Sequence, residues 1–142
     1  MKFKTPTGRF KEINIASYRV DFDGEQGSDF AAEVLDRLYP YWKYDIVVAE
    51  FPVAGRDKMR YDYVNLSRKV VVECDGVQHD DPLAYHNRGS KAVWLAQIKR
   101  DDLKNRMAAA NGWTMVRIKP GDMPKLRDDI KGWFLEMYDI TL

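Results

Sequence analysis

Residues 60–79 read RYDYVNLSRKVVVECDGVQH. Residues 60–66 and 69–75 are rich in valine and tyrosine, which favour β-strands, and a short polar segment lies between them. We therefore predict a β-hairpin. Successive side chains of a strand point to opposite faces of a sheet, so Glu73 and Asp75 share one face at the end of the second strand.

The register of this hairpin brings two acids together. A turn centred on residues 67–68, of either two or four residues, places Asp62 directly opposite Glu73. Like charges at directly opposite positions destabilise a strand pair, and a buried carboxylate is costly unless it is paired or bound to metal. A hard cation such as Mg²⁺ would compensate. The alternative is that these acids pair with Arg60 or Lys69 at a strand edge.

Polar residues follow the second strand. His79 could bind a metal, act as general base for an attacking water, or donate a proton to a leaving oxygen. Alternatively it is a histidine of a surface loop. Gln78 could orient water or phosphate, or only cap a turn. Asp75 precedes Gly76, and Asp-Gly is also a common turn signal.

The rest of the chain predicts helices and strands in alternation. We expect one or two short strands within 8–22, a helix from Ser28 or Asp29 to about Tyr39 that ends at Pro40, a strand at 44–53, a helix at 91–110, a strand at 113–120 and a last helix at 124–138 with Leu126, Ile130, Phe134 and Leu135 inward. This order predicts an α/β fold with a mixed sheet, in which the 91–110 helix crosses over to a further strand.

The length and composition indicate one globular domain. The chain has 142 residues, of which 45% are hydrophobic. We predict a single domain over 28–142 and an N-terminal strand or arm over 1–27 that packs on it, or that could be exchanged in a homodimer. Cys74 is the single cysteine, which excludes an intrachain disulfide and CxxC zinc spacing. The start, MKFKTPTGRF, has no apolar stretch, and no membrane span is visible, so we expect a cytoplasmic protein.

Charge is unevenly distributed along the chain. Residues 1–85 have a balance of −3, residues 86–119 of +6 and residues 120–142 of −2. An acidic cluster followed by a basic segment fits a metal site beside a phosphate-binding surface. A solvated basic helix is the alternative.

The basic segment lies mainly on the helix predicted at 91–110. Arg100 and Lys104 are four residues apart and share a helix face, so they could contact DNA phosphates or stabilise a charged transition state. Alternatively, Arg100 pairs with Asp101. Other side chains are assigned by the same pattern: Trp94, Ile98 and Met107 facing the sheet, Lys99 and Arg106 on the remaining surface, Arg88 and Lys91 in a preceding loop, and Trp94 and Trp113 in the core.

Three sets of residues together resemble the PD-(D/E)XK nuclease superfamily, and in particular its very-short-patch-repair-endonuclease-like branch with phage-encoded members. They are Asp62, the run Glu73-Cys74-Asp75-Gly76-Val77-Gln78-His79, and the later stretch QIKRDDLKNRMAAANGWTMVRI after the loop Tyr85-His86-Asn87-Arg88-Gly89. The resemblance spans roughly residues 28–118. It implies a restriction-endonuclease-like mixed β-sheet flanked by helices, in a bacterial or phage-infected host cell.

The resemblance also implies Mg²⁺-dependent hydrolysis of phosphodiester bonds, with Mn²⁺ as a substitute. Asp62 and Glu73, assisted by Asp75, would hold the metal, and His79 matches the catalytic histidine of this branch. Asp75 stands where most of the superfamily has a lysine, which leaves the general base open. Glu33 matches a further acidic position, or is a solvated carboxylate.

The function expected from these residues is that of a metal-dependent DNA endonuclease, which nicks DNA or cleaves a particular DNA structure. Gln78, Arg88, Lys99, Arg100 and Lys104 are the residues expected to contact nucleic acid. A catalytically inactive nucleic-acid-binding module with the same fold is the alternative, and RNA is the alternative substrate.

Overall fold

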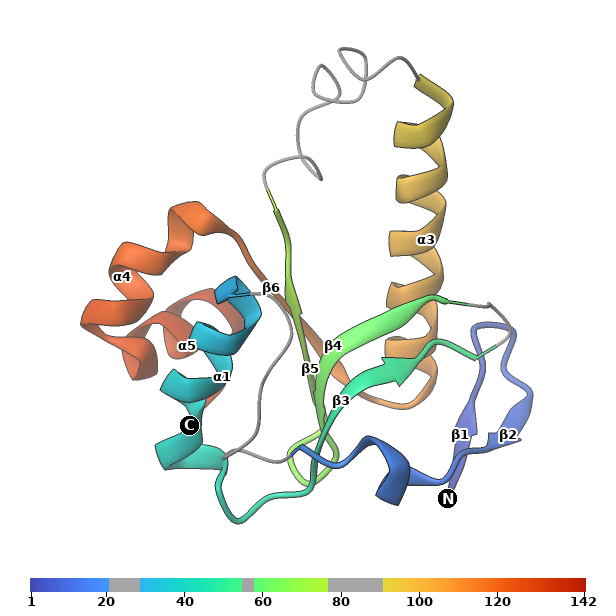
Figure 1. Ribbon diagram of the computed structural model, residues 1–142, viewed down its shortest axis with the longest axis horizontal. Helices are drawn as coiled ribbons and strands as arrows, with labels where there is room; N and C mark the ends of the chain where they lie inside the picture. The colour runs from blue at the N-terminus through green and yellow to red at the C-terminus, as the bar shows by residue number, and fades with distance from the viewer. Residues whose placement is uncertain (21–28, 55–57, 77–90) are drawn as a thin grey trace.

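The computed structural model describes residues 1–20, 29–54, 58–76 and 91–142. Its centre is a mixed four-stranded sheet with helices on both faces (Figure 1). The strands lie in the order β3 (Val47–Pro52), β4 (Arg60–Asn65), β5 (Val70–Cys74) and β6 (Thr114–Ile118). β3, β4 and β5 are antiparallel neighbours, whereas β5 and β6 are parallel. The predicted α/β class is confirmed.

The β4–β5 hairpin has the register that the sequence predicts. Asn65 pairs with Val70, and residues 66–69 form the turn. The fully buried Asn65 side chain holds this turn, because its Oδ1 accepts a hydrogen bond of 2.9 Å from the Arg68 main-chain N–H. Lys69 has a positive φ of 59°, which completes the turn. Counting away from the turn, the pairs are Asn65 with Val70, Val64 with Val71 and Tyr63 with Val72. Asp62 and Glu73 are the residues that follow the last of these pairs.

The helix α3 (Lys91–Ala110) makes the crossover from β5 to the parallel strand β6. It has the predicted bounds and ends at Ala110, two residues before Gly112, whose φ is 71°. The residue before it, Asn111, closes the helix end by donating a side-chain hydrogen bond of 2.8 Å to the Met107 carbonyl. A left-handed residue, usually glycine, directly after a helix is a common way to satisfy its last carbonyls.

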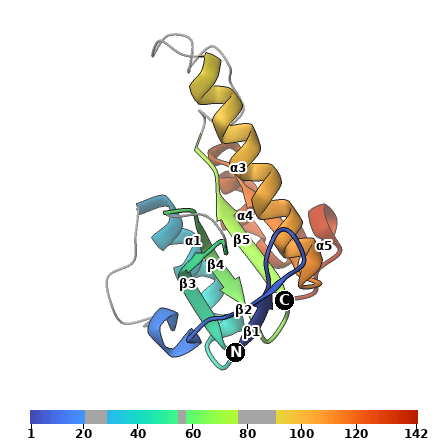
Figure 2. The same ribbon diagram turned by 90° about the vertical axis from the view of Figure 1, so that its right-hand side faces the viewer.

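Hydrophobic side chains pack on both faces of the sheet. One face is covered by α1 (Asp29–Trp42), α4 (Met123–Asp128) and α5 (Ile130–Tyr138), and the other by the C-terminal half of α3 and the N-terminal segment. Figure 2 shows α3 lying across one face with α1 on the far side of the strands. Alternation in β5 accounts for the two layers, because Val70 and Val72 join the first core and Val71 the second.

The N-terminal segment folds as a small two-stranded sheet of its own. β1 (Lys2–Lys4) and β2 (Phe10–Glu12) are antiparallel, and a 3-10 helix follows at Ile15–Tyr18. The buried Phe3 ring attaches this sheet to the domain, since its centroid lies 5.1 Å from that of Phe51 and 5.7 Å from that of Trp113. Trp113 is therefore a core residue, as predicted.

The first and last helices differ from the expectation. Pro40 does not end α1, which continues to the fully buried Trp42. The expected helix over 124–138 is two helices, because Asp129 leaves the helical conformation and caps α5 by accepting a hydrogen bond of 3.0 Å from the Gly132 N–H. After this break Trp133 is buried and Leu135 is 52% exposed, so Leu135 is not inward.

The first half of α3 also corrects the sequence interpretation. Ile98 does not face the sheet but is 44% exposed, and Trp94 is half-buried rather than core. The reason is length: a helix of 20 residues is about 30 Å long, whereas a strand of five residues spans only about 17 Å. The first turns of α3 therefore extend beyond the sheet, as Figure 1 shows. Within the described ranges, every helix is too short or too polar to cross a lipid bilayer.

Candidate active site

β4 and β5 separate beyond the pair Tyr63 and Val72, and two carboxylates lie where the strands part. Glu73 Oε1 accepts a hydrogen bond of 2.9 Å from the Asp62 main-chain N–H, and Asp62 Oδ2 accepts one of 2.7 Å from the Cys74 N–H. Each side chain thus binds the main chain of the opposite strand. We call Asp62 and Glu73 the carboxylate fork. Figure 1 shows β4 curving away from β5 at this end.

In the carboxylate fork, Glu73 is buried and Asp62 is half-buried. Only 3% of Glu73 is exposed. Burial raises the pKa of Glu73 to about 7, with a further rise caused by the charge of Asp62 and an opposing effect of Lys104. Burial likewise raises the pKa of Asp62 above its ordinary value. Two acids are therefore held together where each is harder to ionise than in water.

A lysine of α3 lies beside the carboxylate fork. Lys104 Nζ donates a hydrogen bond of 2.7 Å to Glu73 Oε2, and its side chain is only 13% exposed. The Tyr61 hydroxyl donates a hydrogen bond of 2.6 Å to the Lys104 carbonyl, so β4 fixes the helix main chain at this residue. The sequence had suggested Lys104 as a phosphate contact on a helix surface. The structure places its ammonium against an acid.

Asp75 lies one step further along β5, with a different partner. Arg117 on β6 lies 3.3 Å from Asp75 and 3.7 Å from Asp101, each measured from Arg117 Nη1 to a carboxylate oxygen. Its other terminal nitrogen donates a hydrogen bond of 3.0 Å to the Asn105 side chain. The Asp75 N–H donates to the Ile118 carbonyl at 2.8 Å, which extends the pairing of β5 with β6. Arg117 of β6 thus connects Asp75, at the end of β5, with Asp101 and Asn105 of α3.

The other predicted residues are placed as follows. Lys99 and Arg100 are exposed on the part of α3 before Lys104. Glu33 does not join the carboxylate fork, because it is bound by Arg127 of α4 and Arg37 of α1, at 2.7 and 2.8 Å. These guanidinium groups, Arg127 first, lower the pKa of Glu33 to about 2. Three predicted residues lie outside the described ranges: Gln78, His79 and Arg88.

Sequence reasoning missed two charged residues near the carboxylate fork. Glu50 has a positive φ of 50° within β3, and its charge contributes to the raised pKa of Asp62. A left-handed non-glycine residue within a strand leaves no signature in sequence. Arg117 pairs in register with Glu73 across the parallel strands. Its signal was a lone cation in the otherwise apolar run TMVRI.

The carboxylate fork suits a hard cation. In the described part of the chain, no three acidic, histidine or cysteine side chains gather closely enough to share one ion. Mg²⁺ does not require three, since it is usually held by one or two carboxylates and completes its octahedron with water and substrate phosphate oxygens. Asp62 and Glu73 supply oxygen donors of this kind, next to each other.

Comparison of the chain with family models, with curated proteins and with solved structures finds no match.

Proposed function

We propose that this protein is a metal-dependent DNA endonuclease that hydrolyses phosphodiester bonds at the carboxylate fork. One observation carries the proposal: the buried Glu73 and the half-buried Asp62 lie together where the β4–β5 hairpin opens. Bringing two acids into such a place costs free energy, and perturbed acids of this kind are concentrated at functional sites. A bound divalent cation would offset the cost.

Asp62 and Glu73 would hold Mg²⁺, with Mn²⁺ as a substitute and Asp75 assisting. The ion would supply a Lewis acid for the phosphoryl oxygens and a bound water of lowered pKa. Asp75 is already bound by Arg117, so its position along β5 is fixed before any ligand arrives.

Lys104 would provide the positive charge that a lysine of the strand provides in most PD-(D/E)XK enzymes. PD-(D/E)XK enzymes usually carry a lysine two residues after the acid, where this chain has Asp75. The ammonium of Lys104 lies 2.7 Å from Glu73 and reaches the carboxylate fork from α3 instead. In this position it can stabilise the charge that develops on a phosphate as its bond breaks. Exposed Lys99 and Arg100 on the same helix would contact neighbouring DNA phosphates.

The resemblance of residues 28–118 to the very-short-patch-repair-endonuclease-like branch supports the same activity. It assigns proton transfer to His79, and the residue types of Gln78 and Arg88 suit contacts with the substrate. These roles stay predictions, since the three residues lie outside the described ranges.

Cleavage of supercoiled plasmid in Mg²⁺ or Mn²⁺ tests the proposal. We expect the wild type to nick or linearise the plasmid, EDTA to abolish the reaction, and Glu73→Gln and Lys104→Met each to lower the rate by at least about 100-fold. Glu33→Gln is the matched control, because it makes the same substitution at an acid outside the carboxylate fork. Equal rates for wild type and Glu73→Gln would refute the assignment. A parallel reaction on RNA identifies the preferred nucleic acid.

The ion pairs themselves favour a second candidate, a nucleic-acid-binding module without activity. Lys104 satisfies Glu73 and Arg117 satisfies Asp75 without any metal, as they would in a purely structural network. This candidate predicts that the wild type binds DNA but leaves the plasmid intact in both metals.

A further inference from the structure

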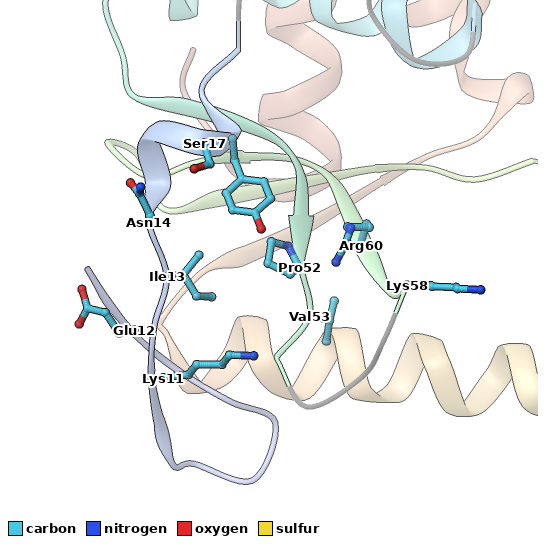
Figure 3. A pocket seen from close by; sticks show the side chains of 10 residues that line it. Lys11, Glu12, Ile13, Asn14, Ser17, Pro52, Val53, Lys58 and Arg60 are labelled. Atoms are coloured by element: carbon cyan, nitrogen blue, oxygen red, sulfur yellow. The ribbon is translucent and has the colours of Figure 1, made fainter.

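A second polar site lies away from the carboxylate fork. A pocket of about 590 Å³ opens between the N-terminal segment and the adjoining ends of β3 and β4 (Figure 3). Its walls include Lys11 and Ser17 on one side and Pro52 and Arg60 on the other. The volume falls in the range of ordinary ligand pockets, which is about 300–1,000 Å³. It is therefore large enough for a nucleotide unit.

The pocket is lined by positive charge. Lys11, Lys58 and Arg60 all contribute to its walls, against one acid, Glu12, among the described residues that line it. Glu12 is bound by the N-terminal ammonium group, and Figure 3 shows its side chain directed away from the pocket. Lys11 and Arg60, in contrast, extend inward from opposite walls.

These cations have no acidic partner among the residues that the structure describes. All three are exposed, whereas the half-buried cations Lys104 and Arg117 each bind a carboxylate within 4 Å. No such ion pair includes Lys11, Lys58 or Arg60 in the described ranges. Converging cations without an internal counter-charge are the arrangement that binds an anion.

One wall of the pocket is rigid and aromatic. The Tyr18 ring packs edge-on against the fully buried Phe51, with 5.6 Å between the ring centroids. Pro52 lies next to it in β3. An aromatic ring and a proline beside cations suit a sugar or base attached to a phosphate.

We infer that this pocket binds a phosphate group of a nucleic-acid strand, through Lys11 and Arg60. The inference builds on the proposed function, because it gives the DNA a second point of attachment. Arg60 lies two residues before Asp62 in β4, a distance of about 6.6 Å along an extended strand. Successive phosphates of one DNA strand are about 3.4 Å apart along the helix axis. The phosphate held here would therefore lie within a few nucleotides of the bond at the carboxylate fork.

The salt dependence of DNA binding tests this inference. The probes are fluorescently labelled 16-nucleotide DNAs, single-stranded and duplex, with either a 5′-phosphate or a 5′-hydroxyl, titrated in EDTA so that cleavage does not interfere. We expect Lys11→Gln and Arg60→Gln each to weaken binding about tenfold and to reduce the slope of log K against log salt by about 1. Lys131→Gln is the matched control, because Lys131 lies on α5, over the other face of the sheet.

The 5′-phosphate distinguishes the two sources of the phosphate. If it strengthens binding to the wild type but not to Arg60→Gln, the pocket holds a strand end. If it has no effect while the slopes still fall, the pocket holds an internal phosphodiester. Slopes and affinities equal to those of Lys131→Gln would overturn the inference.

The plasmid assay remains a separate measurement. Cleavage by the wild type together with unchanged slopes would refute the phosphate pocket alone. Reduced slopes in a protein that leaves the plasmid intact would refute the nuclease and retain the pocket.

Discussion

Glu73 accepts a hydrogen bond from the main-chain N–H of Asp62. Asp62 accepts one from the main-chain N–H of Cys74, the residue after Glu73. These bonds hold the two acids together and favour their charged forms, whereas burial opposes ionisation. Burial has the larger effect on Glu73, whose pKa rises from 4.5 to about 7. The residue therefore changes charge near neutral pH.

Folding stability should reflect this titration. An acid with a raised pKa holds its proton more tightly in the folded than in the unfolded state, so its contribution is present below pH 4.5 and is lost as the pH rises to about 7. In EDTA, we expect wild type to lose roughly 1–3 kcal/mol relative to Glu73→Gln between pH 5 and pH 8. Urea unfolding at both pH values measures this difference.

The control for this experiment is Glu136→Gln, which alters an exposed acid of α5. Its difference from wild type should stay constant between the two pH values. If Glu73→Gln behaved in the same way as Glu136→Gln, the raised pKa of Glu73 would be wrong.

Sequence predicts this site in part, for a physical reason. A hairpin with a short turn has a fixed register, so Asp62 and Glu73 could be placed opposite each other by counting residues. The ion pair of Glu73 with Lys104 depends on how α3 packs on the sheet, 31 residues away along the chain. The ion pairs of Arg117 depend on the same crossover. Counting residues along a hairpin therefore predicts neither the ion pair of Lys104 nor those of Arg117.

At the scale of elements, periodicity locates helices and strands better than it locates their ends. The bounds of α3 and the existence of each strand of the four-stranded sheet follow from residue patterns, whereas β1 lies before the range in which N-terminal strands were expected. The break at Asp129 depends on one side chain that caps a helix, and the continuation of α1 beyond Pro40 depends on the burial of Trp42. Local preferences of this kind are easily overridden by packing.

The end of α3 provides a test of element geometry. Gly112 has a φ of 71°, and a Cβ added there would meet nothing within 4 Å. Gly112→Ala should therefore destabilise the protein only through backbone strain, by about 1–2 kcal/mol in urea unfolding. Gly121→Ala is the control, since a Cβ there also enters open space but its φ is not positive. Equal stability of both variants would contradict the left-handed conformation at the end of α3.

At the scale of the molecule, the sheet separates two cores, and the N-terminal segment belongs to one of them. Phe3 and Ile13 pack with Phe51, Met107 and Trp113. The sequence had suggested an arm over residues 1–27, but it gave no sign of which side chain would attach it. The buried Phe3 and Ile13 both do so, and the ring partners of Phe3 come from β3 and from the end of the α3 crossover.

The attachment of this segment should contribute to global stability. Phe3→Ala removes a ring that is only 3% exposed, so we expect a loss of about 3 kcal/mol in a single urea transition. Phe10→Ala, in the same small sheet but 66% exposed, should cost less than about 1 kcal/mol. A separate early transition, or no change for Phe3→Ala, would show that the segment is an independent arm.

The hydrogen bonds of the carboxylate fork have a consequence for how this chain can vary in length. The same two side chains complete the strand pairing and form the candidate site, so the turn at residues 66–69 sets the geometry of both. Inserting or deleting one residue in that turn would shift the register and move one acid to the opposite face of the sheet. Loops elsewhere on the surface can lengthen at little cost. We therefore expect the length of this turn to stay constant wherever the two acids are needed together.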